Sequence, residues 1–261
     1  MEDKLFSVDK QVVLVCGASR GIGRALAEGF AARGAQVVIA GRESGTLAKT
    51  AEEISSGSKP VKPVVCDVAK PHDITGLVET TLAEFSHIDT LVSVAGVNTR
   101  MKAEEYSVDD YDRIVDINQR GSFVLAQAVG KHMIERKSGS IINVDSLNTY
   151  APLSGVTPYA MSKAGVLMMT RALANEWGRH GVRVNSIAPG FFPTALSKKL
   201  WAQDKMREWA IYNTPLGKLG DVKDLVGAAI FLASEAAAFV SGQTIRVDGG
   251  VTAGINWPIE I

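Results

Sequence analysis

Short apolar runs rich in β-branched residues alternate along the chain with longer segments in which apolar residues recur every three or four positions. The first pattern predicts strands and the second predicts helices. The predicted strands are residues 11–16, 36–40, 61–66, 90–94, 140–144, 182–187 and 244–247. The predicted helices are residues 21–33, 44–55, 73–85, 108–136, 159–178 and 222–234. Strands this apolar are typically buried on both faces, so the pattern predicts a parallel sheet with helices on both sides.

The order of these elements predicts one α/β domain over residues 1–261, with a Rossmann-type, doubly wound parallel sheet. The length alone would also permit two small domains, but no linker rich in proline, glycine or serine divides the chain. Because crossovers between parallel strands are right-handed, a ligand crevice is expected at the carboxyl ends of the strands.

The charge balance and the cysteines exclude several classes of protein. Lys and Arg together number 28, as do Asp and Glu, so no basic excess predicts nucleic-acid binding. Cys16 and Cys66 each end an apolar run and are expected to be buried thiols rather than a disulfide. The first residues lack the apolar stretch of a signal peptide, and no apolar run is long enough to span a membrane. We therefore expect a cytoplasmic enzyme with a small-molecule substrate, and we assign no metal site.

A glycine-rich turn separates the first predicted strand from the first predicted helix. Gly17, Gly21 and Gly23 follow the spacing Gly-x-x-x-Gly-x-Gly, which differs from the Gly-x-Gly-x-x-Gly of other dinucleotide folds. Glycines allow positive φ and let backbone amides approach a pyrophosphate at the positive end of a helix dipole. Such turns also occur where no ligand binds, but the position of this one in a doubly wound sheet favours a cofactor site.

The end of the second predicted strand bears on the choice of cofactor. An acid there would bind the ribose 2′-hydroxyl of NAD(H), whereas an arginine accommodates the 2′-phosphate of NADP(H). Gly41 offers no carboxylate, while Arg42 can donate a charge-assisted hydrogen bond to a phosphate, as can Arg20 in the glycine turn. Glu43, one residue further on, is the alternative that favours NAD(H). NADP(H) is therefore preferred and NAD(H) stays open.

Tyr159 and Lys163 are one helical turn apart on the same face of a predicted helix. A free tyrosine has a pKa near 10, and lowering that pKa to about 7 requires roughly 4 kcal/mol. One positive charge about 4 Å away supplies energy of that order at an effective dielectric of 20. The pair is thus a candidate acid/base, although tyrosine–lysine pairs are also frequent on solvated helix surfaces.

Two further polar residues strengthen this interpretation. Ser146 follows the fifth predicted strand, at the expected crevice, where its hydroxyl can stabilise an oxyanion on a substrate carbonyl. Asn118 lies inside the predicted helix 108–136, where an asparagine is otherwise a surface residue or a satisfied buried group. Residues 148–150, which follow the serine closely, are expected to line the pocket.

With these residues in this order, the sequence resembles the short-chain dehydrogenase/reductase family over nearly its whole length. The family's glycine turn matches residues 17–23, and its catalytic residues match Asn118, Ser146, Tyr159 and Lys163. The resemblance implies that Asn118 holds a water in a proton relay that runs through Lys163 to Tyr159. It also implies that Lys163 binds the cofactor ribose and lowers the pKa of Tyr159.

The same resemblance implies a set of cofactor contacts, with Asp67 at the adenine and Thr194 at the nicotinamide. The full set is Gly17, Ser19, Arg20, Gly21, Ile22, Gly23, Arg42, Asp67, Val68, Ala95, Gly96, Tyr159, Lys163, Pro189, Gly190, Phe192 and Thr194.

Four positions depart from the family pattern. Ser93 and Val94 stand where the family has two asparagines, and Cys16 stands where a threonine is common. The small residue that usually precedes the catalytic serine is here Asp145. Its carboxylate either pairs locally, tunes the site or contacts the substrate.

Within the family the amino-acid sequence is most similar to members such as gluconate 5-dehydrogenase and 2-deoxygluconate 3-dehydrogenase. This similarity implies an NADP(H)-dependent interconversion of a secondary alcohol and a ketone on a polar sugar acid or polyol. A 3-oxoacyl thioester reductase is one alternative, and a non-catalytic NADP(H)-binding regulator is another. Residues 190–215 are expected to form a lid over the substrate. Family members are usually homotetramers, and the apolar tail 251–261 either reaches a neighbouring subunit or is frayed.

Overall fold

The computed structural model of the chain describes residues 4–55, 59–194 and 197–254. Within these residues, the strands form one seven-stranded parallel sheet in the order β3-β2-β1-β4-β5-β6-β7. The strands are β1 Val12–Cys16, β2 Gln36–Gly41, β3 Lys62–Val65, β4 Thr90–Ser93, β5 Gly139–Val144, β6 Val182–Pro189 and β7 Thr244–Val247. The predicted doubly wound parallel sheet is confirmed.

The chain order of the strands reverses between β1 and β4, which are neighbours in the sheet. The register places Cys16, the last residue of β1, beside Ala40 of β2 and Ser93 of β4. The segments that follow these strands therefore leave the sheet at the same level. In a doubly wound sheet this switch point is where ligands bind.

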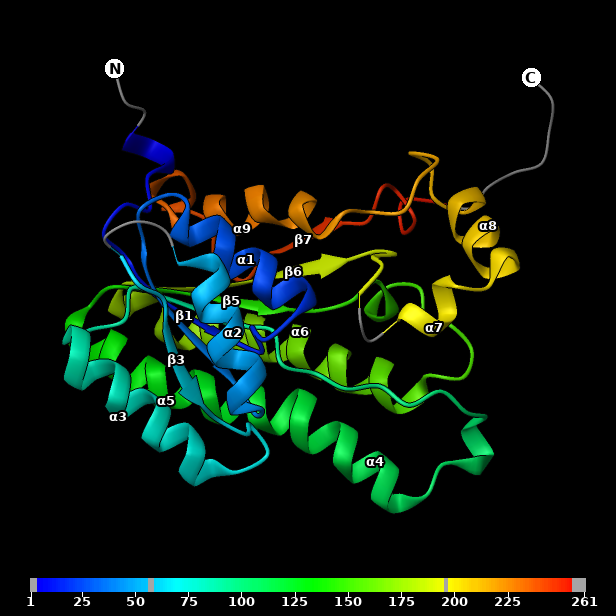
Figure 1. Cartoon of the computed structure of the whole chain (residues 1–261), viewed down its shortest axis with the longest axis horizontal. Helices are drawn as coiled ribbons and strands as arrows, with labels where there is room; N and C mark the ends of the chain where they lie inside the picture. Colours follow the sequence, from blue (N-terminus) through cyan, green and yellow to red (C-terminus); the bar gives the residue numbers. More distant parts are fainter. Residues whose placement is uncertain (1–3, 56–58, 195–196, 255–261) are drawn as a thin grey trace.

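Helices cover both faces of the sheet (Figure 1). They are α1 Gly21–Ala31, α2 Ser44–Ile54, α3 Pro71–Phe85, α4 Val108–Val115, α5 Gly121–Arg136, α6 Thr157–Trp177, α7 Lys198–Trp201, α8 Asp204–Tyr212 and α9 Val226–Ala233. α1, α2 and α9 pack on one face, around fully buried Phe30 and Ile39. α3, α5 and α6 pack on the other face, around fully buried Leu91 and Leu125. Each such side chain contributes roughly 1.5–3 kcal/mol by leaving water, so the two apolar layers hold the sheet between the helices.

The third predicted strand differs from the prediction in its burial. β3 lies at an edge of the sheet, its side chains alternate between half-buried and exposed, and Val65 is 53% exposed. The expectation that every apolar run is buried on both faces is therefore wrong for β3. Cys16 and Cys66 are both buried free thiols, as predicted.

The long helix predicted over residues 108–136 is interrupted. α4 and α5 are joined by a π-helical turn, Asp116–Arg120, in which the amide of Gly121 bonds the carbonyl of Asp116. A Cβ on Gly121 would lie 2.7 Å from the carbonyl oxygen of Val68, so only glycine permits this close approach. A π turn inserts one residue into a helix and leaves the helical periodicity within each flanking segment, so each segment still predicted a helix.

The predicted lid segment forms two short helices, α7 and α8, beyond the carboxyl ends of the strands (Figure 1). The ring of Phe191 makes edge-on contacts with Trp201, at 5.7 Å between centroids, and with Trp209, at 5.6 Å. These contacts attach both helices to the end of β6. Of the predicted tail, residues 255–261 lie outside the described residues. None of the described helices combines the length and apolarity needed to span a membrane.

Candidate active site

Four polar residues predicted from the sequence meet at the carboxyl edge of the sheet. Tyr159 and Lys163 lie in the first two turns of α6, Ser146 follows β5, and Asn118 lies in the π turn. Lys163 is 4% exposed, Ser146 6% and Asn118 0%, while Tyr159 is half-buried. A Cβ on Gly96 would lie 3.4 Å from Asn118 Oδ1 and 3.7 Å from Lys163 Nζ, so both side chains border the loop that follows β4.

The side chain of Asn118 connects three parts of the site. Its Oδ1 accepts the Val97 amide at 2.7 Å, and its Nδ2 donates to the Val97 carbonyl at 2.9 Å. The same Nδ2 also donates to Ser162 Oγ at 3.0 Å, and Ser162 lies on α6 between Tyr159 and Lys163. The π turn thereby directs a fully buried amide toward both the β4 loop and α6.

Lys163 is held as a buried cation. Its Nζ donates to the Val144 carbonyl at 2.7 Å and lies 5.9 Å from the centroid of the Tyr159 ring. Burial lowers the pKa of Lys163 to about 8, against the attraction of Asp145, which raises it. The ammonium therefore stays mostly protonated at neutral pH.

The pKa of Tyr159 corrects one sequence-based expectation. Burial of the phenol raises this pKa, a hydrogen bond with Ser146 lowers it, and the charge of Asp145 raises it further. The shift is opposite to the lowering expected from Lys163, because desolvation of the phenol is the largest effect and the Lys163 ammonium donates to the Val144 carbonyl. At neutral pH the phenol is protonated and suited to donate a proton.

The glycine turn forms the cradle predicted for a dinucleotide. Gly17 has a φ of +90°, and a Cβ on it would lie 2.5 Å from the backbone nitrogen of Ala95. Gly21 begins α1 with a φ of +58°, and a Cβ there would come within 3.5 Å of Thr194. The turn therefore packs closely on the β4 loop at Gly17 and leads into the amino terminus of α1 beside Thr194, the kind of position at which a pyrophosphate binds.

The adenosine end of the predicted cofactor site lies where β2 and β3 end. A Cβ on Gly41 would collide with Ser19 Oγ, so glycine lets this hydroxyl approach the strand. Arg20 and Arg42 are exposed beside it. Asp67 is half-buried after β3, and its Oδ1 accepts the Ala69 amide at 3.1 Å. The chain thus supplies cationic donors and a carboxylate at the edge where the sequence predicted them.

The remaining predicted contacts differ in how much of each residue reaches this edge. Ile22 and Gly23 lie in the first turn of α1, and Pro189 ends β6. The ring of Phe192 is buried, and a Cβ on Gly220 would collide with it, so its side chain belongs to the core. Val68 is likewise a core side chain. Phe192 and Val68 can therefore offer a cofactor only their backbone atoms, because their side chains are buried in the core.

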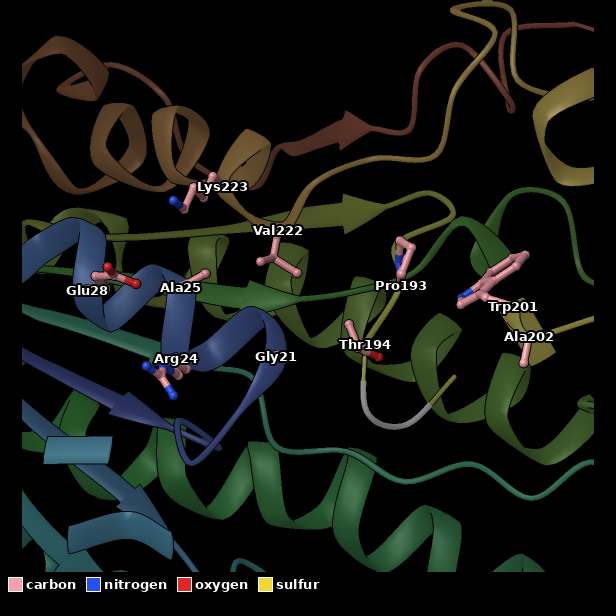
Figure 2. Close-up of a pocket in the computed structure, with 10 residues that line it drawn as sticks. All are labelled: Gly21, Arg24, Ala25, Glu28, Pro193, Thr194, Trp201, Ala202, Val222 and Lys223. Atoms are coloured by element: carbon pink, nitrogen blue, oxygen red, sulfur yellow. The ribbon is translucent and has the colours of Figure 1, made fainter. Parts of the chain in front are cut away.

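A cleft of about 600 Å³ opens beside the glycine turn (Figure 2). It is lined by Gly21, Arg24, Ala25, Glu28, Pro193, Thr194, Trp201, Ala202, Val222 and Lys223. Figure 2 shows Arg24 and Ala25 of α1 on one side of it and Pro193, Thr194 and Trp201 on the other. Gly21 and Thr194 link the cleft to the cradle, whereas none of the four catalytic candidates lines it.

Comparison with known proteins agrees with this geometry. A family model described as enoyl-(acyl carrier protein) reductase matches residues 17–252. Gluconate 5-dehydrogenase from Gluconobacter oxydans is 38% identical over 248 residues, which are 95% of this chain and 97% of that protein. A 3-oxoacyl-[acyl-carrier-protein] reductase from Synechocystis is 38% identical over 244 residues, covering 92% and 96%. The crystal structure of a gluconate 5-dehydrogenase from Burkholderia cenocepacia, in complex with NADP and tartrate, is 37% identical with a TM-score of 0.93, covering 97% and 99%.

The chain belongs to the short-chain dehydrogenase/reductase family. The resemblance seen in its motifs is confirmed, and the chain is an alcohol/ketone oxidoreductase of this family.

The structure explains how the chain accommodates its departures from the family pattern. Ser93 Oγ donates to Ser122 Oγ at 3.4 Å, and Ser122 Oγ donates to the Asn118 carbonyl at 2.8 Å. These two serines link β4 to α5 where the family has an asparagine. Val94 instead packs against the apolar layer under α1.

Asp145 is a buried acid beside the site. It is 2% exposed, and its Oδ1 accepts the Thr149 hydroxyl at 2.6 Å. Its Oδ2 has no hydrogen-bond partner among the described residues. Burial raises the pKa of Asp145 to about 6, although Thr149 and Lys163 both lower it. Asp145 therefore pairs locally, and its charge also acts on Lys163 and Tyr159.

Sequence reasoning missed two polar contacts in this site. Ser162 accepts from Asn118 and donates to the Tyr159 carbonyl at 2.7 Å. Asn148 was expected only as pocket lining, but its backbone nitrogen and its Nδ2 both donate to Ser146 Oγ. The available signal was position, since one serine lies between the tyrosine and the lysine and one asparagine lies two residues after the serine.

We predict that Asp145→Asn changes how stability depends on pH. A pKa raised in the folded state means that stability is complete below the ordinary value of 3.8 and is lost as pH rises through about 6. This rise corresponds to roughly 3 kcal/mol. Between pH 4 and pH 7 the free energy of unfolding of the native protein should fall by up to about 3 kcal/mol relative to the variant, measured by urea titration.

The control for this measurement is Asp109→Asn, which removes an exposed carboxylate. Its free energy of unfolding should follow the pH dependence of the native protein. Parallel pH dependences for the native protein and Asp145→Asn would contradict the prediction.

Proposed function

We propose that this chain is an NADP(H)-dependent oxidoreductase that interconverts a secondary alcohol and a ketone on a polar sugar acid or polyol. The observation that carries the proposal is the burial of Asn118, Ser146 and Lys163 around Tyr159, beside the glycine cradle. Similarity over nearly the whole chain to enzymes named for gluconate supports the substrate class.

The proposed chemistry requires a proton donor and a group that polarises the carbonyl. The hydroxyls of Ser146 and Tyr159 lie next to each other, so a carbonyl oxygen between them accepts hydrogen bonds from both. Tyr159 gives its proton to that oxygen in reduction and takes it back in oxidation. A nicotinamide cofactor held by the glycine turn and Lys163 would supply the hydride for carbonyl reduction and would accept it in alcohol oxidation.

Lys163 and Asn118 have supporting parts in this proposal. The buried ammonium stabilises the negative charge that stays on Tyr159 after its proton has left. Asn118 holds the β4 loop and α6 at a constant separation through Val97 and Ser162. Because burial raises the pKa of Tyr159, the phenol is protonated at neutral pH, which is the form that carbonyl reduction uses, whereas alcohol oxidation uses the phenolate and should be faster at alkaline pH.

We predict that Tyr159→Phe lowers turnover by roughly 10²–10⁴-fold, because it removes the proton donor and keeps the ring. The dissociation constant of NADPH, measured by fluorescence titration, should stay within about twofold, since one hydroxyl contact is lost among many. Tyr111→Phe, which alters an exposed tyrosine, is the matched control. Native turnover in Tyr159→Phe would contradict the proposed role.

The preference for NADP(H) is supported by the end of β2. Gly41 offers no carboxylate, and Arg20 and Arg42 are exposed there for a 2′-phosphate. Glu43, the alternative that favours NAD(H), stands at the N-cap position of α2 without a side-chain cap hydrogen bond, and its Oε2 accepts the Thr46 hydroxyl at 3.3 Å. The similar gluconate 5-dehydrogenase crystallised with NADP agrees with this preference.

We predict that Arg42→Ala raises the dissociation constant of NADPH about 10- to 150-fold, because a charged hydrogen bond is worth roughly 1.5–3 kcal/mol. The dissociation constant of NADH should change less than about twofold, since NADH has no 2′-phosphate. Isothermal titration with both cofactors measures the difference, and Arg179→Ala, at an exposed arginine after α6, is the control. Equal losses for the two cofactors would argue for NAD(H).

A reductase of 3-oxoacyl thioesters is the second candidate, because the relative of that name is as similar as the first. We predict that a turnover screen with NADPH favours 5-keto sugar acids over 3-oxoacyl thioesters by at least about tenfold in kcat/KM, a difference that one or two polar contacts supply. The opposite order would transfer the assignment to thioesters. Tight NADPH binding with no turnover of either class would support the non-catalytic regulator.

Three further parts of the proposal rest on the sequence and on exposed surfaces. Residues 190–215 are proposed as a lid, since α7 and α8 pack on Phe191 beside the cleft. A homotetramer is proposed because Phe123 of α5 and Met161 and Met168 of α6 are large exposed apolar side chains, which are typical of interfaces. A cytoplasmic location stays a prediction from the sequence.

A further inference from the structure

The hydroxyl of Ser146 accepts two hydrogen bonds from a single residue. The backbone nitrogen of Asn148 donates to Ser146 Oγ at 3.1 Å, and the side-chain Nδ2 of Asn148 donates to the same oxygen at 3.2 Å. A serine hydroxyl has two acceptor lone pairs and one O–H donor. When both lone pairs are occupied by N–H groups, the O–H group is all that Ser146 has left to offer.

The orientation of the Asn148 amide is determined by a third contact. Its Oδ1 accepts the backbone amide of Leu153 at 2.9 Å. A backbone N–H can only donate, so the oxygen of the amide must face Leu153 and the NH₂ group must face Ser146. Rotating the amide by half a turn would place two donors against each other at Leu153 and leave Ser146 facing an acceptor.

The turn that carries Asn148 is held in place by the two residues that flank Asn148. Asn148 lies in the single 3₁₀ turn Leu147–Thr149, and Leu147 is 3% exposed and belongs to one buried apolar cluster with Phe191 and Ala210. Thr149 Oγ1 donates to the buried Asp145 at 2.6 Å. Asn148 therefore keeps its two hydrogen bonds to Ser146 as long as this turn is intact.

We propose that Asn148 is a positioning residue that makes Ser146 an obligate hydrogen-bond donor toward Tyr159 and the substrate carbonyl oxygen. The inference rests on the proposed catalytic role of Ser146. Without Asn148 the serine proton can turn toward other acceptors, and its donation to the reacting oxygen becomes one of several orientations. Accepting two N–H groups also polarises the O–H bond and strengthens its donation.

The effect reaches Tyr159 through Ser146. The hydrogen bond from Ser146 lowers the pKa of Tyr159, and the charged groups that act near this phenol are Asp145, which raises its pKa, and Lys163 on α6. Losing a directed hydrogen bond should therefore raise the pH at which Tyr159 becomes a base. A residue that only stabilised the turn would leave that pH unchanged.

The test compares the pH dependence of alcohol oxidation in Asn148→Ala and Asn148→Asp with the native protein. In Asn148→Ala, kcat should fall about tenfold, and the apparent pKa of the profile should rise by about 0.5 to 1, the effect of one hydrogen bond. In Asn148→Asp the new carboxylate accepts the serine proton, so kcat should fall about 10²-fold, as when an oxyanion donor is removed.

The controls separate this inference from loss of structure. Both variants should bind NADPH with the native dissociation constant and unfold cooperatively, and Asn148→Asp, which keeps the size of the side chain, is decisive if Asn148→Ala does not fold. Asn175→Ala, at an exposed asparagine of α6, should leave kcat and the pH profile at their native values. Native kcat and pH profiles in both Asn148 variants would overturn the inference.

Ser146→Ala distinguishes failure of this inference from failure of the proposed function. Native turnover in Ser146→Ala would overturn the role of Ser146 and the inference with it. If Ser146→Ala loses turnover while the Asn148 variants do not, only the inference fails. The double variant Ser146→Ala/Asn148→Ala should lose no more than Ser146→Ala alone, since Asn148 acts through the serine. Multiplied losses would show that Asn148 acts independently and would overturn the proposal.

Discussion

The pair of hydrogen bonds between the Asn118 side chain and the Val97 backbone holds the site in one geometry. An unpaired buried amide would cost roughly 1–3 kcal/mol. The π turn that directs Asn118 toward Val97 is therefore stable only because both the oxygen and the NH₂ group of the amide are hydrogen-bonded. Its third hydrogen bond, to Ser162 on α6, fixes the position of α6 relative to the β4 loop. Because Tyr159 and Lys163 lie on the same helix as Ser162, this contact also positions them.

Burial governs the protonation of the groups that surround this framework. Desolvation raises the pKa values of Asp145 and Tyr159 and lowers that of Lys163. Each shift favours the neutral form, and the mutual attraction of Asp145 and Lys163 opposes it. A protonated phenol near a buried ammonium results, which is suited to give a proton to a carbonyl oxygen and to stabilise the charge left behind.

The register of the sheet connects this site to the cofactor cradle. Because β1, β2 and β4 end at the same level, Gly17, Gly41 and the β4 loop emerge side by side. The contact between Gly17 and Ala95 then leaves no room for a side chain at the turn. A dinucleotide that spans this edge would reach from Arg42 at one end to Lys163 at the other, so cofactor recognition and proton transfer share one rigid support.

The sequence by itself determined the order of strands and helices, the parallel sheet, the glycine turn and the four catalytic candidates, because periodicity and motif spacing are local properties of a chain. Only the tertiary structure decided that β3 is an edge strand, that a π turn carries Asn118, and that burial raises the pKa of Tyr159. It also decided that Asn148 directs Ser146 and that Asp145 pairs with Thr149. These features depend on which side chains lose water and which backbone groups they meet, and those neighbours are brought together by packing rather than by adjacency in the chain.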